Sequence, residues 1–313
     1  MSAFAPWQQR AFERAIGSLA GQRLGHGLLI CGPARLGKRA LADALIARLL
    51  CTGAEGAAPA CGGCRSCRLL AAGTHPDLRR ISFALNDKGE PRSVIVVEQI
   101  RLLSEAIGLS AQLGGAIVTV IDPADALNAN AANALLKTLE EPQPGRYLLL
   151  ITDSPHRLPA TVRSRCQRIE LRPPDIDEAR AWLTAEGVAP ARIDEALRLA
   201  DGHPGEARAL IEAEGLALRT VVEKDLAALA KGRASLSDTV KAWLADRPSD
   251  RLAHAAAYVR DCGRAELVSG KAQGFTERAA WYDHANRVRA QLYTPLKSDL
   301  LLGELLLRWR EVA

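Results

Sequence analysis

The chain has 313 residues, of which 48% are apolar and 25% charged, the composition of a globular protein long enough for two or three domains. Its net charge of +5 comes from 41 basic residues set against 36 acidic ones, a balance too even to indicate a dedicated nucleic-acid-binding protein. The apolar run Gly27–Cys31 is too short to cross a bilayer, and the first residues carry charges where a signal peptide has its apolar core, so we expect a cytoplasmic protein with no membrane partner.

The first 170 residues alternate between short apolar runs and helical patterns. Strands are expected at Leu28–Cys31, Val94–Val97, Ala116–Ile121 and Tyr147–Ile151. Helices are expected at Arg39–Leu50, Gln99–Ile107 and Asn128–Glu140. Short, continuous apolar runs are typical of strands buried on both faces of a parallel sheet. We therefore predict a doubly wound α/β domain over residues 1–170.

After Pro173 and Pro174 the pattern is helical to the end of the chain. Helices are expected at Ile176–Glu186, Arg192–Ala200 and Glu206–Glu214, then through a longer region that closes with Leu300–Trp309. The segment from Gly202 to Gly205 reads as a tight turn. We predict a small helical domain over residues 171–214 and a helical bundle over 215–313.

The first expected strand runs into a glycine-rich loop, Gly32-Pro33-Ala34-Arg35-Leu36-Gly37-Lys38-Arg39. Gly32, Gly37 and Lys38 match the phosphate loop, in which backbone N–H groups at a helix N-terminus and a lysine hold phosphate. Arg39 stands where a serine or threonine hydroxyl should hold Mg²⁺. The alternative is a glycine turn followed by a solvated lysine.

The strand ending at Ile121 is followed by Asp122-Pro123-Ala124-Asp125. Asp122 is well placed to help hold Mg²⁺ near the phosphate loop. The next position would normally carry a carboxylate that orients the attacking water, and Pro123 has no such group. Asp125 is expected to face elsewhere. We predict no efficient ATP hydrolysis by this chain alone, while nucleotide binding through Lys38 stays open.

Four of the seven cysteines, Cys51, Cys61, Cys64 and Cys67, lie within 17 positions. Zinc prefers four soft ligands in a tetrahedron, and close C-x-x-C pairs supply neighbouring vertices. With four sulfur ligands and no open coordination position, a structural zinc is predicted. Disulfides and free thiols are the alternatives; redox chemistry would need a thioredoxin-like context that is not found here.

Two further motifs resemble those of the bacterial clamp-loader subunits of the AAA+ family. They are the run from Asn133 to Pro142, NALLKTLEEP, and Arg163-Ser164-Arg165-Cys166. With the cysteine loop they cover roughly residues 25–170 in the family's order. The resemblance implies a RecA-like AAA+ domain with an inserted zinc module at 51–67, a helical lid domain and a C-terminal collar that mediates oligomerisation.

Within that family the ATPase (gamma/tau) subunits keep an intact phosphate loop and an Asp-Glu pair. The chain is more similar to the delta-prime branch, which has lost such residues; the delta branch generally lacks both the zinc loop and Ser-Arg-Cys. The resemblance implies gamma/tau-type and delta subunits as partners, with the sliding clamp and primed DNA reached through the complex. It also implies that ATP and Mg²⁺ binding by this chain is doubtful.

The resemblance assigns roles to three more positions. Arg165 would be an arginine finger that reaches the ATP bound by a neighbouring subunit. Thr152 lies where the family has its first sensor residue, although a threonine that caps the strand end explains it equally well. The second sensor arginine would align with Gly205, a third departure from an active ATPase.

Two other functions compete with this interpretation. An active ATPase motor would rest on the retained Gly32, Gly37, Lys38 and Asp122, but three departures are rarely compensated together. A zinc-dependent DNA-binding module would use basic residues around the cysteine loop, namely Arg65, Arg68, Arg79 and Arg80.

Overall fold

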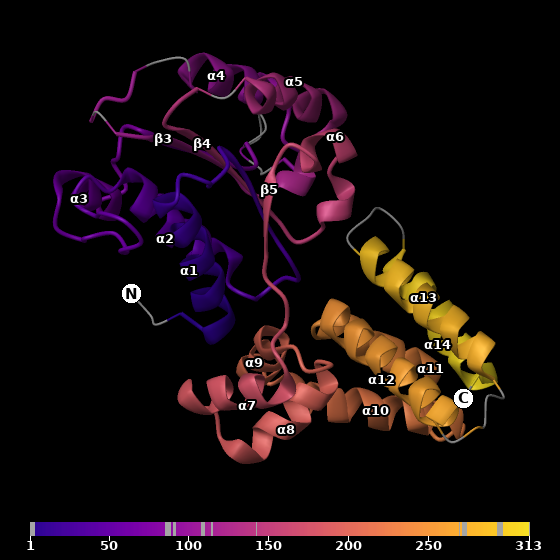
Figure 1. Cartoon of the computed structure of the whole chain (residues 1–313). Helices are drawn as coiled ribbons and strands as arrows, with labels where there is room; N and C mark the ends of the chain where they lie inside the picture. Colours follow the sequence, from indigo (N-terminus) through magenta and orange to yellow (C-terminus); the bar gives the residue numbers. More distant parts are fainter. Residues whose placement is uncertain are drawn as a thin grey trace. The chain divides into compact units, whose positions relative to one another are not determined.

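The computed structural model describes residues 4–84, 89, 92–107, 110–113, 115–141, 143–268, 270, 274–292 and 297–312. The chain divides into two compact units (Figure 1). The first comprises Met1–Gly187 with Gly202–Gly205, and the second Val188–Asp201 with Glu206–Ala313. The domain limits expected from the sequence remain a prediction.

A five-stranded parallel sheet forms the centre of the first unit. Its strands are β1 (Gly27–Cys31), β2 (Leu78–Ile81), β3 (Ile117–Ile121), β4 (Arg146–Thr152) and β5 (Gln167–Glu170). Their order in the sheet is β2-β3-β4-β1-β5, and every pairing is parallel. Because β1, β3 and β4 lie side by side, the loops that follow them meet at one edge of the sheet. The predicted parallel α/β sheet is confirmed.

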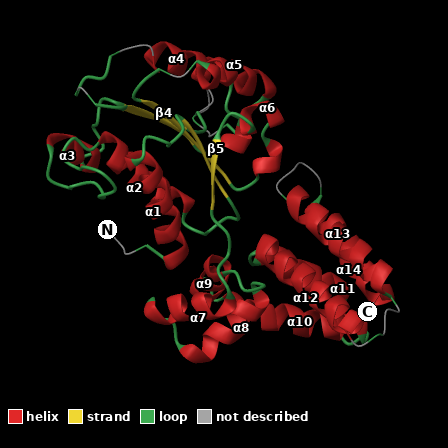
Figure 2. Cartoon of the chain, in the orientation of Figure 1, coloured by secondary structure: helices red, strands yellow, loops and turns green. Residues whose placement is uncertain are grey.

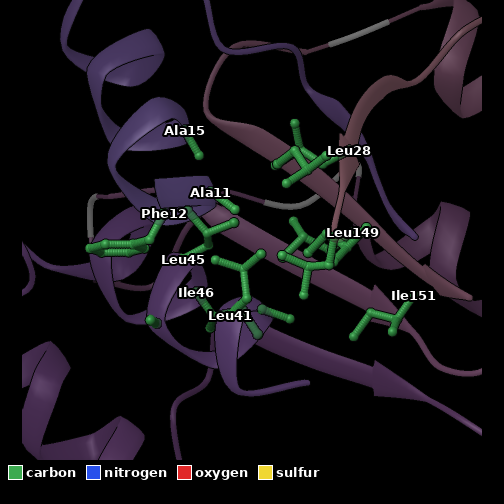
Figure 3. Close-up of a cluster of buried hydrophobic side chains, with 14 of the residues drawn as sticks. Ala11, Phe12, Ala15, Leu28, Leu41, Leu45, Ile46, Leu149 and Ile151 are labelled. Carbon is green, nitrogen blue, oxygen red and sulfur yellow. The ribbon is translucent and has the colours of Figure 1, made fainter. Parts of the chain in front are cut away.

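Helices cover both faces of this sheet (Figure 2). The helices of this unit are α1 (Pro6–Ala20), α2 (Lys38–Leu50), α3 (Arg65–Ala71), α4 (Val97–Ile107), α5 (Ala129–Glu140), α6 (Ala160–Arg163) and α7 (Ile176–Ala185), with short 3₁₀ turns at Ala124–Ala126 and Pro155–Arg157. Of these, α1 and α2 lie on one face of the sheet and α4 and α5 on the other. Successive residues of a strand point to opposite faces. Leu28 accordingly packs with α1 and α2 (Figure 3). Ile30 belongs to the same cluster, and Leu29 packs with α4 and α5.

One predicted strand is wrong, and two strands were not predicted. The expected strand Val94–Val97 is wrong, because only Ile95 forms an isolated bridge, to Leu127, and α4 begins at Val97. Strands β2 and β5 were not expected. Their sequences, LRRI and QRIE, are polar because both lie at the edges of the sheet, where side chains reach water.

The regular elements described in the second unit are all helices. Its helices are α8 (Pro190–Leu199), α9 (Pro204–Glu212), α10 (Gly215–Ala230), α11 (Leu236–Ala245), α12 (Pro248–Val268), α13 (Phe275–Gln291) and α14 (Ser298–Val312). Trp243, Trp281 and Trp309 are buried in one cluster. The indole N–H groups of Trp281 and Trp309 donate to Leu305 O and Leu226 O, each at 2.9 Å. These tryptophans therefore serve core packing. Among the helices described, none is both long and apolar enough to span a bilayer.

Candidate functional site

The glycine-rich loop lies between β1 and α2, as the phosphate-loop pattern predicts. Gly32 has φ +136°, and a Cβ there would lie 2.0 Å from Leu171 O. Gly37 has φ +83°, and a Cβ there would lie 1.7 Å from the side-chain nitrogen of Gln8. Both positions need glycine because of backbone conformation and close packing.

Two side chains of α1 hold this loop from one side. The Trp7 indole donates to Leu36 O at 3.0 Å, and the Gln8 amide donates to Gly37 O at 3.0 Å. Sequence reasoning missed both contacts, because neither residue belongs to a recognisable motif. The loop is thus held by the protein's own side chains.

Lys38 is only 5% exposed, so the alternative of a solvated lysine is wrong. Its ammonium donates to Gly32 O at 2.8 Å and to Pro33 O at 2.5 Å. It also lies 2.5 Å from a carboxylate oxygen of Asp153, which directly follows β4. Asp153 was not predicted. Its place after a buried parallel strand beside β1 is the signal that could have found it.

Arg39 and Asp122, which occupy the two positions that would hold Mg²⁺, contact each other. The Arg39 Nε lies 2.6 Å from Asp122 Oδ2, and its terminal nitrogen lies 2.9 Å from Oδ1. The hydrogen bond to Asp122 raises the pKa of Arg39. Mg²⁺ needs oxygen ligands, whereas a guanidinium offers only donors and here takes both oxygens of Asp122. These residues do not fit a magnesium ion.

Thr152, the last residue of β4, is 1% exposed. Its hydroxyl donates to Asp125 Oδ1 at 2.6 Å and accepts the Ser154 N–H at 2.9 Å. The Asp125 carboxylate is therefore engaged by a strand end. These contacts are those of a residue that caps a strand, the alternative weighed for Thr152.

Gly205 lies against the glycine-rich loop within the same compact unit. A Cβ at this position would lie 2.0 Å from Arg35 O and 2.8 Å from the Arg35 Cβ. The position that would carry a second sensor arginine therefore has no room for any side chain while the backbone keeps this conformation.

The four cysteines converge at the other end of α2. Their sulfur atoms all lie within 4.8 Å of one another, and Cys51 Sγ is 3.5 Å from Cys61 Sγ and 3.9 Å from Cys64 Sγ. Four ligands about 2.3 Å from a tetrahedral zinc lie about 3.8 Å apart. The donor set fits a structural zinc held by Cys51, Cys61, Cys64 and Cys67.

The thiols of Cys64 and Cys67 have pKa values shifted in opposite directions. The backbone N–H of Cys67 lowers the pKa of Cys64 to about 5, and burial raises the pKa of Cys67 to about 12. Zinc binds thiolates, so metal binding at neutral pH would displace a proton from Cys67.

The surroundings of the cysteines are built from buried polar groups. The Arg48 guanidinium donates to Ala58 O and Gly56 O at 2.7 and 2.8 Å, which fixes the loop between Cys51 and Cys61. The His75 Nδ1 accepts the Asp77 N–H at 3.1 Å, so its Nε2 carries the proton and donates to Ser66 Oγ at 2.6 Å. These contacts join the cysteine loop to β2.

Arg165 follows α6, and its side chain is 37% exposed. One terminal nitrogen donates to Thr161 O at 3.0 Å, and the other lies 2.6 Å from Glu140 Oε1. Glu140 is the last residue of α5, which contains most of the clamp-loader-like run from Asn133. Pro142, the last residue of that run, lies outside the described residues. The two motifs are therefore joined by an ion pair.

Fold and site together define a parallel α/β protein of the phosphate-loop class, with a four-cysteine module and incomplete Mg²⁺ ligands. The family described as "DNA polymerase III, delta subunit" matches residues 7–175. DNA polymerase III subunit delta' of Escherichia coli K12 is 35% identical over 320 residues, which cover 97% of this chain and 94% of the relative. The chain belongs to the delta-prime family of DNA polymerase III subunits.

Other relatives agree with this assignment. DNA polymerase III subunit delta' of Pseudomonas aeruginosa is 40% identical over 245 residues, 78% of this chain and 72% of that protein. The tau subunit of Escherichia coli K12 is 32% identical over 187 residues, 56% of this chain and 28% of tau.

Proposed function

We propose that this chain is a non-hydrolysing delta-prime subunit of a bacterial clamp loader, which donates Arg165 to the ATP site of a neighbouring gamma/tau-type subunit. In this role it supports loading of the sliding clamp onto primed DNA during replication. The observation that carries the proposal is the position of Arg165, exposed after α6 and, among the described residues, in contact with Thr161 O and Glu140. In the assembly the guanidinium would exchange one anionic partner, Glu140, for the γ-phosphate of the neighbour's ATP.

The chain's own loop supports the non-hydrolysing part of the proposal. Arg39 offers no oxygen ligand to Mg²⁺. Pro123 offers no base, and Asp125 is bonded to Thr152. Gly205 packs on the loop backbone where a sensor arginine would have to stand. Three separate parts of an ATPase site are therefore missing or engaged.

We also propose the cofactor, the domain roles and the partners of this chain. Zinc is the structural cofactor, and ATP with Mg²⁺ is held by the neighbours. The gamma/tau-type and delta subunits are the direct partners, and the clamp and DNA are reached through the complex. Residues 171–214 act as the lid and residues 215–313 as the collar of a cytoplasmic assembly.

The test is ATP turnover by the clamp loader reconstituted with an Arg165→Ala chain. Removing an arginine finger lowers the rate at the site it serves by roughly 10³-fold or more. ATP turnover by the complex should therefore fall at least by the fraction that the neighbouring site contributes to the total. Arg172→Ala is a matched control, since Arg172 is also an exposed arginine paired with a glutamate, Glu170. Turnover unchanged by Arg165→Ala at saturating clamp and primed DNA would refute the finger.

The competing ATPase function has its own measurement. The purified wild-type chain should hydrolyse ATP no faster than its Lys38→Ala variant. Turnover that depends on Lys38 would mean that the chain is a motor.

A further inference from the structure

The two positions that hold Mg²⁺ in an active phosphate-loop protein are joined here by a bidentate ion pair. We propose that Arg39 is an internal cation that stands in for Mg²⁺, and that the Arg39–Asp122 pair is what prevents this loop from binding a magnesium nucleotide. This inference deepens the non-hydrolysing part of the proposed function and rests on it.

The geometry of the pair excludes the metal in two ways. Arg39 removes the hydroxyl oxygen that the loop would otherwise contribute. Its guanidinium also engages both carboxylate oxygens of Asp122, at 2.6 and 2.9 Å. Mg²⁺ demands near-ideal octahedral geometry at about 2.0–2.1 Å and is usually held by one or two carboxylates. While the arginine fork engages both of its oxygens, the Asp122 carboxylate is not free to bind that metal.

The rest of the loop is already formed. Gly32 and Gly37 have the positive φ values of a loop that curves into a helix N-terminus. The Lys38 ammonium points into the loop, where Gly32 O and Pro33 O accept from it. Lys38 and Arg39 each have a carboxylate partner, Asp153 and Asp122 respectively. The loop therefore keeps its shape without a ligand.

The pair can be removed without damage to the core. The Arg39 side chain is 68% exposed and that of Asp122 is 22% exposed. Replacing Arg39 by serine leaves no buried cavity, frees the Asp122 carboxylate and restores the hydroxyl that phosphate loops use. Pro123 is unchanged by this replacement, so the variant still lacks a base to activate water.

The test is titration calorimetry of the purified full chain with ATP, in Mg²⁺ and in EDTA. We expect Arg39→Ser to bind ATP at least about tenfold more tightly than wild type, a gain of about 1.4 kcal/mol, and only when Mg²⁺ is present. ATP hydrolysis should stay at the wild-type level. Arg39→Thr, which supplies the same hydroxyl, should behave alike.

Two controls isolate the pair. Arg80→Ser breaks another exposed Arg–Asp pair of the same unit, with Asp43 at 2.6 Å, and should leave ATP binding unchanged. The double variant Arg39→Ser/Asp122→Asn should lose the gain, because the freed carboxylate is the expected ligand. A thermal melt of each variant shows that it is folded.

Three results would overturn the inference. They are no gain in folded Arg39→Ser and Arg39→Thr, a gain that persists in EDTA, and wild-type binding of ATP that already depends on Mg²⁺. The measurement uses the chain alone, whereas the arginine finger is tested in the assembled complex. The two ideas can therefore fail separately.

Discussion

The two ends of α2 carry the two sites of this chain, and they differ in how their charged or metal-binding groups are satisfied. At its first turn, Lys38 and Arg39 each contact a carboxylate supplied by the protein, Asp153 and Asp122. At its last turn, Cys51 begins a set of four thiols that converge on one another. The four thiols are compatible with a metal ion that the chain itself does not supply. The two cations at the start of α2 are already paired with carboxylates of the same chain.

The largest effect is expected when one ligand of the expected zinc is removed. A structural zinc contributes roughly 10 kcal/mol or more of apparent binding free energy in small zinc peptides, so Cys64→Ser should lower the stability of the first unit more than any other change considered. We expect one zinc per wild-type chain by elemental analysis and a large fall in melting temperature in the variant. Cys262→Ser, a cysteine of the second unit, is the control. Purified wild-type protein that holds no zinc would break the comparison.

The second test asks whether the phosphate loop is maintained by packing alone. Gly32→Ala places a Cβ 2.0 Å from Leu171 O at φ +136°, and a conformation of this kind costs about 1–3 kcal/mol before any clash. We expect a loss of at least about 3 kcal/mol in urea unfolding, with no nucleotide present. Gly17→Ala, in α1 with nothing within 4 Å of the added Cβ, should raise stability slightly. Equal effects of the two substitutions would contradict the packing argument.

The third test concerns Lys38, whose ammonium is bonded to the loop backbone and to Asp153. Lys38→Ala leaves the buried acceptor Gly32 O without its donor, and an unsatisfied buried group costs about 1–3 kcal/mol. We expect a loss of that size in chemical unfolding of the nucleotide-free protein. A variant as stable as wild type would mean that the lysine is kept for a ligand instead.

The smallest expected effect is that of Arg39→Ala on stability. Exposed ion pairs contribute about 0–1 kcal/mol and are screened by salt, and Arg39 is 68% exposed. We expect a change of less than about 1 kcal/mol that shrinks further in 1 M salt. A loss well above this value would show that the pair holds the fold together, in addition to occupying the magnesium position.

Much of the fold was predictable because its strands are local features. The runs at Leu28–Cys31 and Tyr147–Ile151 are short, continuous and apolar, as strands buried on both faces must be. Strands β2 and β5 escaped prediction because edge strands are half in water and carry no such run. Val94–Val97 was wrongly expected to be a strand, because four apolar residues next to a helix start look the same as a short strand.

The cysteine cluster was predicted for a related reason. All four thiols belong to one short segment, so spacing alone brings them together. Arg165 was identified by its motif, but its contact with Glu140 was not. The roles of Asp153, Trp7 and Gln8 were missed because each reaches the phosphate loop from a distant part of the chain.

The sequence by itself determined the α/β class, the phosphate-loop turn, the four-cysteine module and the departures at Arg39, Pro123 and Gly205. Only the tertiary structure decided what those departures do. Arg39 meets Asp122 across 83 positions because β1 and β3 are separated only by β4 in a parallel sheet, whose carboxyl ends share one edge. Spacing along a chain fixes short-range contacts, but the pairing of strands determines which distant charges meet.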